Sequence, residues 1–177
     1  MRIQNLKGYS KPKKLIRGKN IIFEAFWIFF FKPLVNSFLP GSKWRTIILK
    51  SFGAKIGKSV RFNPGLKIKM PWKLYIGDNS WIGEETWIDN IAQVNISENV
   101  CISQGVYLCT GNHDFKKSSF ELTCRPINIE SHVWVGAKSI IGPGYTIGQG
   151  SVITIGSIVK KDIPPDCIFK NNKCLNL

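Results

Sequence analysis

The stretch YLCTGNHDFKKSSFELTCRP, residues 107–126, contains His113, one of only two histidines in this chain of 177 residues. A histidine side chain has an unperturbed pKa of about 6.5, so a neutral imidazole can accept a proton near neutral pH and serve as a general base. Asp114 is adjacent, and Glu84 belongs to an earlier part of the chain that could line the same cleft. These residue types suit the removal of a proton from a hydroxyl group. A main-chain carbonyl that holds the ring would serve without any carboxylate.

The elements that position His113 follow a period of six. Aliphatic or aromatic residues recur at this spacing at Ile56, Phe62, Ile68; Ile76, Ile82, Ile88, Val94; Ile96, Ile102, Leu108; and Ile129, Val135, Ile141, Ile147, Ile153, Val159. This period fits neither the 3.6 of a helix nor the alternation of a long strand. It is typical of short strands joined by tight corners, three of which make one turn of a solenoid with a continuous aliphatic column inside.

The period stops after Leu108 and resumes near Ile129. The polar residues between these points predict a loop over 111–126 that projects from one corner of the solenoid. His113 lies at the root of this loop, where a rigid coil would hold it while it still reaches solvent. The other histidine, His132, precedes an inward position and is expected on the exterior of the coil.

The repeat, an aliphatic residue followed by Gly, two variable positions and a small residue, resembles that of the hexapeptide-repeat acyltransferases. Within that family, WRTIILKSFGAKIG, PWKLYIGDNSWIGEETWIDN, ISQGVYLCTGNHD and IGPGYTIGQGSVITIGSIVKKDIP are similar to the colanic-acid type O-acetyltransferases, relatives of galactoside and maltose acetyltransferases. The resemblance implies a mainly β fold, a left-handed parallel β-helix over 55–163. It also implies transfer of an acetyl group from acetyl-CoA to a sugar hydroxyl in surface polysaccharide biosynthesis.

The family's catalytic histidine lies in a T-G-x-H type motif, and Thr110-Gly111-Asn112-His113 matches it position by position. The resemblance therefore assigns the general base to His113. It also places Asp89 where relatives have an acid that contacts the acceptor hydroxyl or the histidine. The substrate-binding candidates are Glu84, Asn112 and Asp114.

The resemblance also implies a homotrimer with a donor site between neighbouring subunits. Its coenzyme-binding candidates are Trp134 and Ala137 in VWVGA, Ile155 in VITIGS, and Lys160 and Lys161 in VKKDIP. The two lysines would lie toward the phosphate end of the coenzyme, where positive charge is useful. No metal site is expected.

The N-terminal segment, residues 1–54, is predicted to be helical in part, and 164–177 is predicted to be a tail. Residues 1–61 contain 14 Lys or Arg and one acid, Glu24, although the whole chain carries 25 bases and 11 acids. The apolar run within NIIFEAFWIFFFKPLVNSFLP is too short for a membrane-spanning helix, and Pro33 interrupts it. Two interpretations stay open: residues 20–39 cap the solenoid, or residues 1–40 contact an anionic membrane surface.

The short helix expected in SKWRTIILKSFG has Ser42 as its N-cap and Gly53 at its end. Five cysteines without a CxxC pair, and no secretory signal, predict reduced thiols and a cytoplasmic protein. The second interpretation of the N-terminus adds peripheral attachment to the inner face of the cytoplasmic membrane.

Other functions stay open. One is a membrane-associated acyltransferase for a non-sugar small-molecule hydroxyl, and another is a non-catalytic β-helix binding protein. A zinc hydro-lyase on the same solenoid would need about three histidines around the metal, and the chain has two. Nucleic acid is not an expected partner, because no recognition motif is present and the basic residues are mixed with a very apolar segment.

Overall fold

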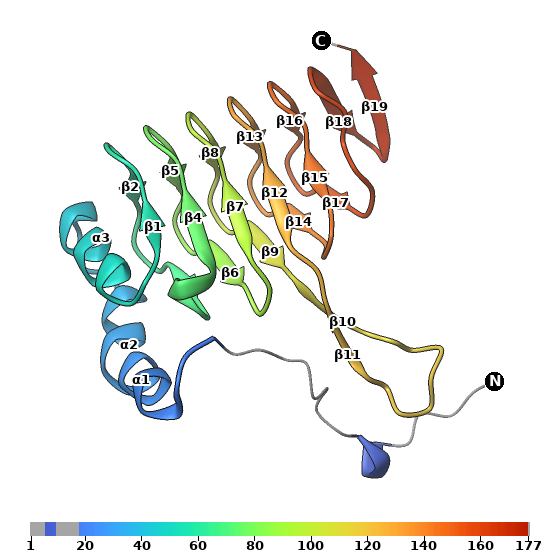
Figure 1. Ribbon diagram of the computed structural model, residues 1–177. Coiled ribbons are helices and arrows are strands. Elements are labelled where there is room, and N and C mark those ends of the chain that lie inside the picture. Colours follow the sequence, from blue (N-terminus) through green and yellow to red (C-terminus); the bar gives the residue numbers. More distant parts are fainter. Residues whose placement is uncertain (1–5, 10–17, 177) are drawn as a thin grey trace.

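Three β-sheets, parallel except for the terminal strand of one, wind around one axis in the computed structural model, which describes residues 6–9 and 18–176 (Figure 1). Sheet A contains β1 (Lys55–Ile56), β4 (Leu74–Ile76), β7 (Val94–Ile96), β12 (Ile127–Ile129) and β15 (Thr146–Ile147). Sheet B contains β2 (Arg61–Phe62), β5 (Trp81–Ile82), β8 (Cys101–Ile102), β13 (Trp134–Val135), β16 (Val152–Ile153), β18 (Cys167–Lys170) and β19 (Lys173–Asn176). Sheet C contains β3 (Lys67–Ile68), β6 (Trp87–Asp89), β9 (Tyr107–Cys109), β14 (Ile140–Ile141) and β17 (Ile158–Val159). The predicted parallel β-helix is confirmed.

The core is the column of residues that the period of six places inside. Every one of these positions is buried, and each stacks on its equivalent in the next coil, as Ile82 does on Ile102 and Ile102 on Val135. Short parallel strands are stable here because both neighbours of an inner strand satisfy its backbone groups. Aliphatic burial along this column is what holds the coils together.

The corners of the coils are closed by small residues. Ser80 is fully buried, and its hydroxyl donates to Ser97 O at 2.9 Å and accepts from Val100 N at 3.1 Å. Gly77 packs so closely on the next coil that a β-carbon there would lie 2.5 Å from Glu98 N. The small residues of the repeat therefore satisfy the backbone at each bend and let the coils approach.

One coil is interrupted between β9 and β12. Ile76 pairs with Ile96, 20 residues later, but Ile96 pairs with Ile129, 33 residues later. The additional chain forms an antiparallel hairpin of β10 (Gly111–His113) and β11 (Leu122–Cys124), which projects away from the sheets (Figure 1). The predicted loop 111–126 thus contains a two-stranded ribbon, whose ladder hydrogen bonds give it a defined shape.

Four helical segments of the N-terminal region lie at the first coil: α1 (Ile21–Phe26), η2 (Trp27–Phe31), α2 (Lys32–Val35) and α3 (Ser42–Ser51). Trp27 is fully buried, and its indole N–H donates to Lys69 O at 3.0 Å. The rings of Phe23, Trp27 and Phe31 lie 4.9 to 5.3 Å from that of Phe52. One face of this region therefore caps the open end of the solenoid.

Arg45 of α3 joins these helices to each other. It is fully buried, and its guanidinium donates to Val35 O at 3.1 Å, Ser37 O at 2.7 Å and Gly41 O at 2.8 Å. Its burial lowers the pKa of the guanidinium from the ordinary value. Three carbonyls in the connection between α2 and α3 are thus satisfied by one side chain.

The expected cap of α3 is wrong in one respect. Gly41, with φ 114°, precedes the helix as its N-cap, and Ser42 is the first helical residue. The Ser42 hydroxyl instead accepts from Phe62 N at 2.9 Å. This contact forms because α3 packs against β2, whose Phe62 amide is available as a donor. Gly53, with φ 88°, follows the helix as expected.

The remaining short elements are η1 (Leu6–Gly8) and η3 (Pro71–Lys73). Residues 1–5 and 10–17 of the predicted N-terminal segment, and Leu177, lie outside the described residues. None of the helices within the described ranges is both long and apolar enough to cross a membrane.

The segment 164–177, predicted as a tail, adds two strands to sheet B. β18 pairs in parallel with β16, and β19 folds back on β18 through Asn171 and Asn172, with φ of 52° and 63°. Asparagine tolerates this left-handed conformation, which a two-residue hairpin turn requires. Sheet B therefore continues beyond residue 163.

Replacement of Ile102 tests the aliphatic column. We expect Ile102→Ala to lower the free energy of unfolding by about 2–5 kcal/mol and Ile102→Val by about 0.5–1.5 kcal/mol, because the smaller side chains leave a cavity between Ile82 and Val135. Urea unfolding followed by circular dichroism measures both values. Ile47→Ala, at an exposed position of α3, is the control. An Ile102→Ala cost no larger than that of the control would contradict the stacked core.

Candidate active site

His113 is the last residue of β10. Phe120, in the hairpin loop just before β11, holds its ring. His113 pairs with Leu122 in the ladder, and its Nδ1 lies 2.7 Å from the carbonyl oxygen of Phe120. The two rings are stacked, with centroids 4.3 Å apart and planes inclined by 3°. Phe120 has φ of 48°, and its carbonyl and its ring both contact His113.

This contact indicates the tautomer of the neutral imidazole. A carbonyl oxygen can only accept a hydrogen bond, so we assign the proton of the neutral ring to Nδ1. The lone pair is then on Nε2, which makes no hydrogen bond to the residues that the structure describes. Of the arrangements left open by the sequence, the main-chain carbonyl is the one seen at the ring.

A pocket of about 690 Å³ lies between the hairpin and sheet C. His113 lines it together with Asn112 and Asp114, so the structure brings three of the predicted site residues together. Residues that the sequence did not single out also line it, among them Tyr107, Cys109, Arg125, Tyr145 and Ile140. Hydroxyl, amide, carboxylate and guanidinium groups therefore surround the imidazole, and such groups can bind a polyhydroxylated substrate.

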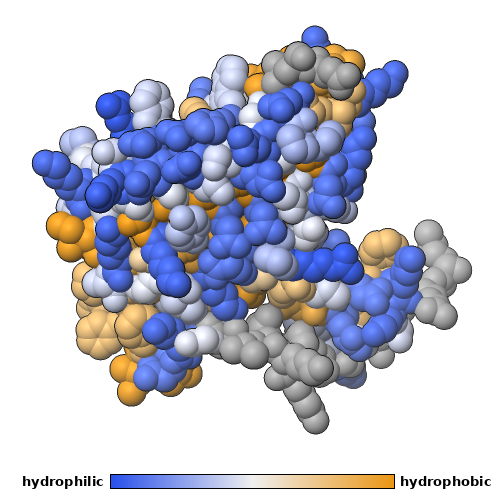
Figure 2. All heavy atoms as spheres, turned by 45° about the horizontal axis from the view of Figure 1, so that its top comes forward, coloured by the Kyte–Doolittle hydropathy of each residue, from blue (hydrophilic) through white to orange (hydrophobic). Residues whose placement is uncertain are grey.

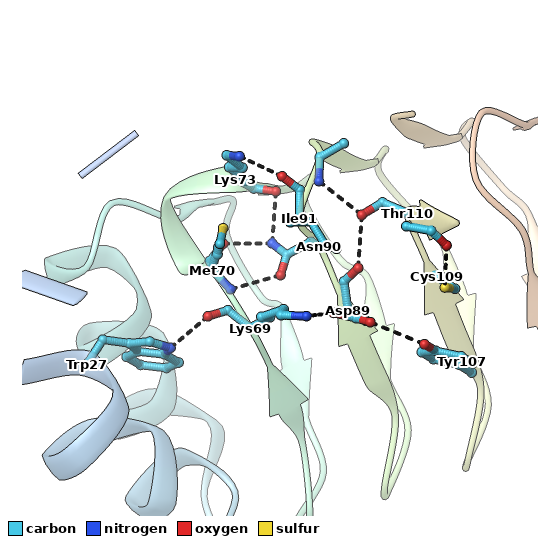
Figure 3. Close-up of polar contacts among 12 residues, drawn as sticks. Trp27, Lys69, Met70, Lys73, Asp89, Asn90, Ile91, Tyr107, Cys109 and Thr110 are labelled. Carbon is cyan, nitrogen blue, oxygen red and sulfur yellow. Dashed lines mark hydrogen bonds and ion pairs between the residues drawn. The ribbon is translucent and has the colours of Figure 1, made fainter. Parts of the chain in front are cut away.

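Asp89 lies outside this pocket. One carboxylate oxygen meets the ammonium of Lys69 at 2.8 Å, and the other accepts from the Tyr107 hydroxyl at 3.2 Å (Figure 3). Only 13% of the Asp89 side chain is exposed. No hydrogen bond joins Asp89 to His113 in the described part of the chain. Asp89 reaches the pocket through Tyr107, whose pKa is raised by burial, by Cys109 and by Asp89 itself.

The root of the hairpin is fixed by Thr110. This residue is fully buried, and its hydroxyl donates to Asp89 O at 2.9 Å and accepts from Ala92 N at 3.0 Å (Figure 3). At Gly111, a β-carbon would lie 2.8 Å from the end of the Ile91 side chain. The first two residues of the T-G-x-H type motif thus anchor the ribbon that carries the histidine.

Glu84 is not brought to the pocket within one chain. It is exposed at the corner between sheets B and C, where its backbone oxygen accepts from Gly105 N at 2.7 Å. Its predicted substrate-binding role therefore has no support from the arrangement of a single subunit.

A second pocket, of about 520 Å³, adjoins the first along β17. Ile155, Lys160 and Lys161 line it, as do Asn171 and Asn172 of the terminal hairpin. Lys160 and Ile158 border both pockets. Three of the predicted coenzyme contacts therefore lie together, on a surface that leads away from His113.

Of the other two predicted coenzyme contacts, Ala137 lies beside this pocket and Trp134 lies on the outer face of sheet B. The carbonyl of Ala137 accepts from Gly156 N at 2.9 Å, which places Ala137 on the coil next to the pocket wall. Trp134 is half exposed on the outer face of sheet B, where its indole N–H donates to Ser103 Oγ at 2.9 Å.

Sequence reasoning missed two aromatic neighbours of His113. Phe120 belongs to the polar loop, and nothing in its residue type marks the carbonyl that holds the ring. Tyr9 comes from the far N-terminus, and its ring centroid lies 6.0 Å from that of His113. Their separation from the motif left no spacing signal that could have identified them.

Comparisons with known proteins assign this hexapeptide β-helix to a class of acyl-transfer enzymes. No family model matches the chain. A protein of Escherichia coli, provisionally named a colanic acid biosynthesis acetyltransferase, is 36% identical over 175 residues, 96% of this chain and 93% of that one. The galactoside O-acetyltransferase of Escherichia coli is 32% identical over 168 residues, 92% of this chain and 77% of that one.

A solved structure points to the same class of enzyme as these relatives. The hexapeptide-repeat-containing acetyltransferase of Vibrio cholerae, in complex with acetyl coenzyme A, superimposes with a TM-score of 0.70 at 26% identity, over 77% of this chain and 75% of that one. This chain belongs to the hexapeptide-repeat acetyltransferases, and it is an acetyltransferase.

Replacement of Phe120 tests how the ring is held. We expect Phe120→Leu to lower kcat by roughly 2- to 13-fold, because the stacked contact is worth about 0.5–1.5 kcal/mol and its loss lets the imidazole turn away from its working orientation. KM for the acyl donor should stay constant. Steady-state kinetics measure both, with Ser118→Ala as an exposed control in the same loop. A change confined to KM would refute an orienting role.

Proposed function

We propose that this protein transfers the acetyl group of acetyl-CoA to a hydroxyl of a sugar in surface polysaccharide biosynthesis, with His113 as the general base. The observation that carries the proposal is the 2.7 Å contact between His113 Nδ1 and Phe120 O, which leaves Nε2 as the basic nitrogen in a pocket of polar side chains. The names of the relatives, a colanic acid biosynthesis acetyltransferase and a galactoside O-acetyltransferase, support a sugar as the acceptor.

In the proposed reaction, Nε2 of His113 takes the proton of the acceptor hydroxyl. At the same time, the hydroxyl oxygen bonds to the thioester carbonyl carbon. The Phe120 carbonyl accepts from Nδ1 throughout, and so stabilises the imidazolium that forms. When the carbon–sulfur bond breaks, Nε2–H returns the proton to the departing thiolate. The products are an O-acetyl ester and a free thiol, and the ring is neutral again.

The donor would lie along the two adjoining pockets. Lys160 and Lys161 provide positive charge for the phosphates, and Ile155 and Ile158 provide apolar surface for the pantetheine arm. We assign Ala137 to the rim of the same groove, because its carbonyl accepts from Gly156 in the pocket wall, and Trp134 stays a predicted contact on the outer face of sheet B. The lining residues thus fit the coenzyme, and the thioester would meet His113 where the two pockets join.

We also propose a homotrimer with the donor site between subunits. The outer face of sheet B exposes Trp81 and Trp134, and that of sheet C exposes Trp87, Ile140 and Ile158. Large exposed apolar side chains on two flat faces favour side-by-side packing of copies of the chain. A neighbouring subunit would also deepen the two pockets.

Asp89 stays a predicted catalytic residue, and we propose that it acts indirectly. Its hydrogen bond to Tyr107 and its ion pair with Lys69 support a positioning residue, one that acts on the pocket through the Tyr107 hydroxyl. The acceptor contacts proposed for one subunit are Asn112 and Asp114.

The general base is tested by His113→Gln. We expect kcat to fall by at least about 10²-fold, because a positioned base contributes roughly that much or more, while KM for acetyl-CoA and the oligomeric mass stay the same. Thiol release is followed with acetyl-CoA and a panel of sugars, nucleotide sugars and lipid-linked saccharides. His132→Gln, at the exposed second histidine, is the control. A His113→Gln enzyme with nearly full turnover would remove His113 from the mechanism, and a wild-type protein active only on non-sugar alcohols would exclude a sugar acceptor.

The donor groove is tested by Lys161→Gln. We expect KM for acetyl-CoA to rise about tenfold, roughly 1.4 kcal/mol, with kcat unchanged, because a charge-assisted contact to phosphate is lost in the pocket that His113 does not line. Lys58→Gln, an exposed lysine on another corner, removes the same charge and is the control. Equal effects of the variant and the control would place the phosphates elsewhere.

A further inference from the structure

The helical stretch Ile21–Val35 has two apolar faces. The inner face packs on the β-helix, with Glu24, Trp27 and Val35 buried and Phe23 and Phe31 packed against the core. The buried positions recur at three- and four-residue intervals, as one side of a helix requires. This inner face fully accounts for the capping of the first coil.

The outer face is also apolar, and no part of the described chain covers it. It consists of large hydrophobic side chains that are between 39% and 77% exposed: Ile21, Ile22, Phe26, Ile28, Phe29, Phe30, Leu34, Phe38 and Leu39. Figure 2 shows hydrophobic residues gathered at the helical end of the molecule. We call these nine residues the outer apolar face. An exposed apolar surface of this size usually marks an interaction site.

The charges around the outer apolar face indicate the kind of partner. Lys32 lies within the helical stretch, and Lys43 and Lys50 are exposed on the neighbouring α3. The one acid of residues 1–61, Glu24, is buried against the β-helix and does not offset them at the surface. Aromatic side chains bordered by lysines match the interface of an anionic bilayer, where rings lie among the headgroups and ammonium groups meet lipid phosphates.

The outer apolar face lies where a bound bilayer would be on the same side of the molecule as the candidate active site. Figure 1 shows α1 and the β10–β11 hairpin extending to the same side of the β-helix. Tyr9, on the chain that leads to these helices, lies against His113. A bilayer bound by the helices would therefore lie on the side where the hairpin presents its histidine.

We propose that the outer apolar face is a membrane-docking surface, which inserts its aromatic and aliphatic side chains into the headgroup region of an anionic lipid bilayer. Docking is peripheral, because the same helices are held to the β-helix by their inner face. This inference does not depend on the identity of the acceptor or on His113.

Vesicle co-sedimentation of the full-length protein tests the proposal. The probes are vesicles of phosphatidylcholine alone and of phosphatidylcholine mixed with phosphatidylglycerol. We expect wild-type protein to sediment with the mixed vesicles and much less with the neutral ones. Phe29→Gln/Phe30→Gln should weaken binding to the mixed vesicles by at least about tenfold, because two aromatic side chains no longer enter the interface.

Two comparisons keep the test specific. Leu175→Gln, at an exposed apolar position at the other end of the molecule, should bind vesicles as the wild type does. The thermal unfolding midpoint and thiol release with a water-soluble acceptor should be unchanged in Phe29→Gln/Phe30→Gln, because glutamine is a good helix former and both positions face outward.

The proposal is overturned if wild-type protein stays in the supernatant with anionic vesicles, or if the double variant binds them as well as the wild type. Equal binding to neutral and anionic vesicles would overturn the role of the lysines. Light scattering after size exclusion addresses the competing occupant, a second copy of the chain. If the double variant has a smaller oligomeric mass than the wild type and the wild type does not bind vesicles, this face is a subunit contact instead.

Discussion

The stacking of one inward aliphatic side chain on its equivalent in the next coil is the constraint on which the rest of the structure depends. Ile82, Ile102 and Val135 lie in one such row, and comparable rows run along the other sheets. A two-residue strand has too few hydrogen bonds to be stable alone, so each coil depends on burial against its neighbours. The same constraint limits what the coil can do chemically, because nearly every side of it is used for stacking and the functional groups must come from additions to it.

The hairpin between β9 and β12 is such an addition, and its rigidity comes from the coil. Ile96 still stacks on Ile129 across the insertion, so the hairpin leaves and rejoins a complete turn. Thr110 ties its root to the preceding coil, and the ladder between β10 and β11 brings the Phe120 carbonyl to Nδ1 of His113. A ring fixed by a main-chain group needs no carboxylate partner. Asp89 instead accepts a hydrogen bond from Tyr107, and its charge is balanced by Lys69.

The fold was predictable from the sequence because its signal is repeated, and a single interruption in a repeat is easy to detect. The place of His113 on a projecting segment was predictable for the same reason, whereas Lys160 and Lys161, which follow β17, became candidates only through the family resemblance. The partners of the site residues were not. Main-chain carbonyls have no residue type to mark them, and Lys69 reaches Asp89 only because the coil happens to be 20 residues long at that point. Arg45 looked like one surface base among many, yet it is fully buried on three carbonyls. Ser42 had the residue type of a cap, but its hydroxyl accepts from the amide of Phe62 in β2 and makes no cap bond to the helix.

The N-terminal helices show why capping and membrane contact need not be alternatives. A solenoid end exposes the aliphatic column, so whatever covers it must be apolar on one side. In a helix that serves only this purpose, the opposite side would be polar, as in an ordinary amphipathic surface helix. Here that side keeps Phe26, Phe29 and Phe30 exposed, although polar residues there would leave the inner contacts of Trp27 and Val35 unchanged. Capping therefore explains the four large apolar side chains of the inner face and none of the nine on the outer apolar face. The proposed bilayer gives the outer apolar face a second apolar environment, and the lysines on the same helices favour one that carries negative charge.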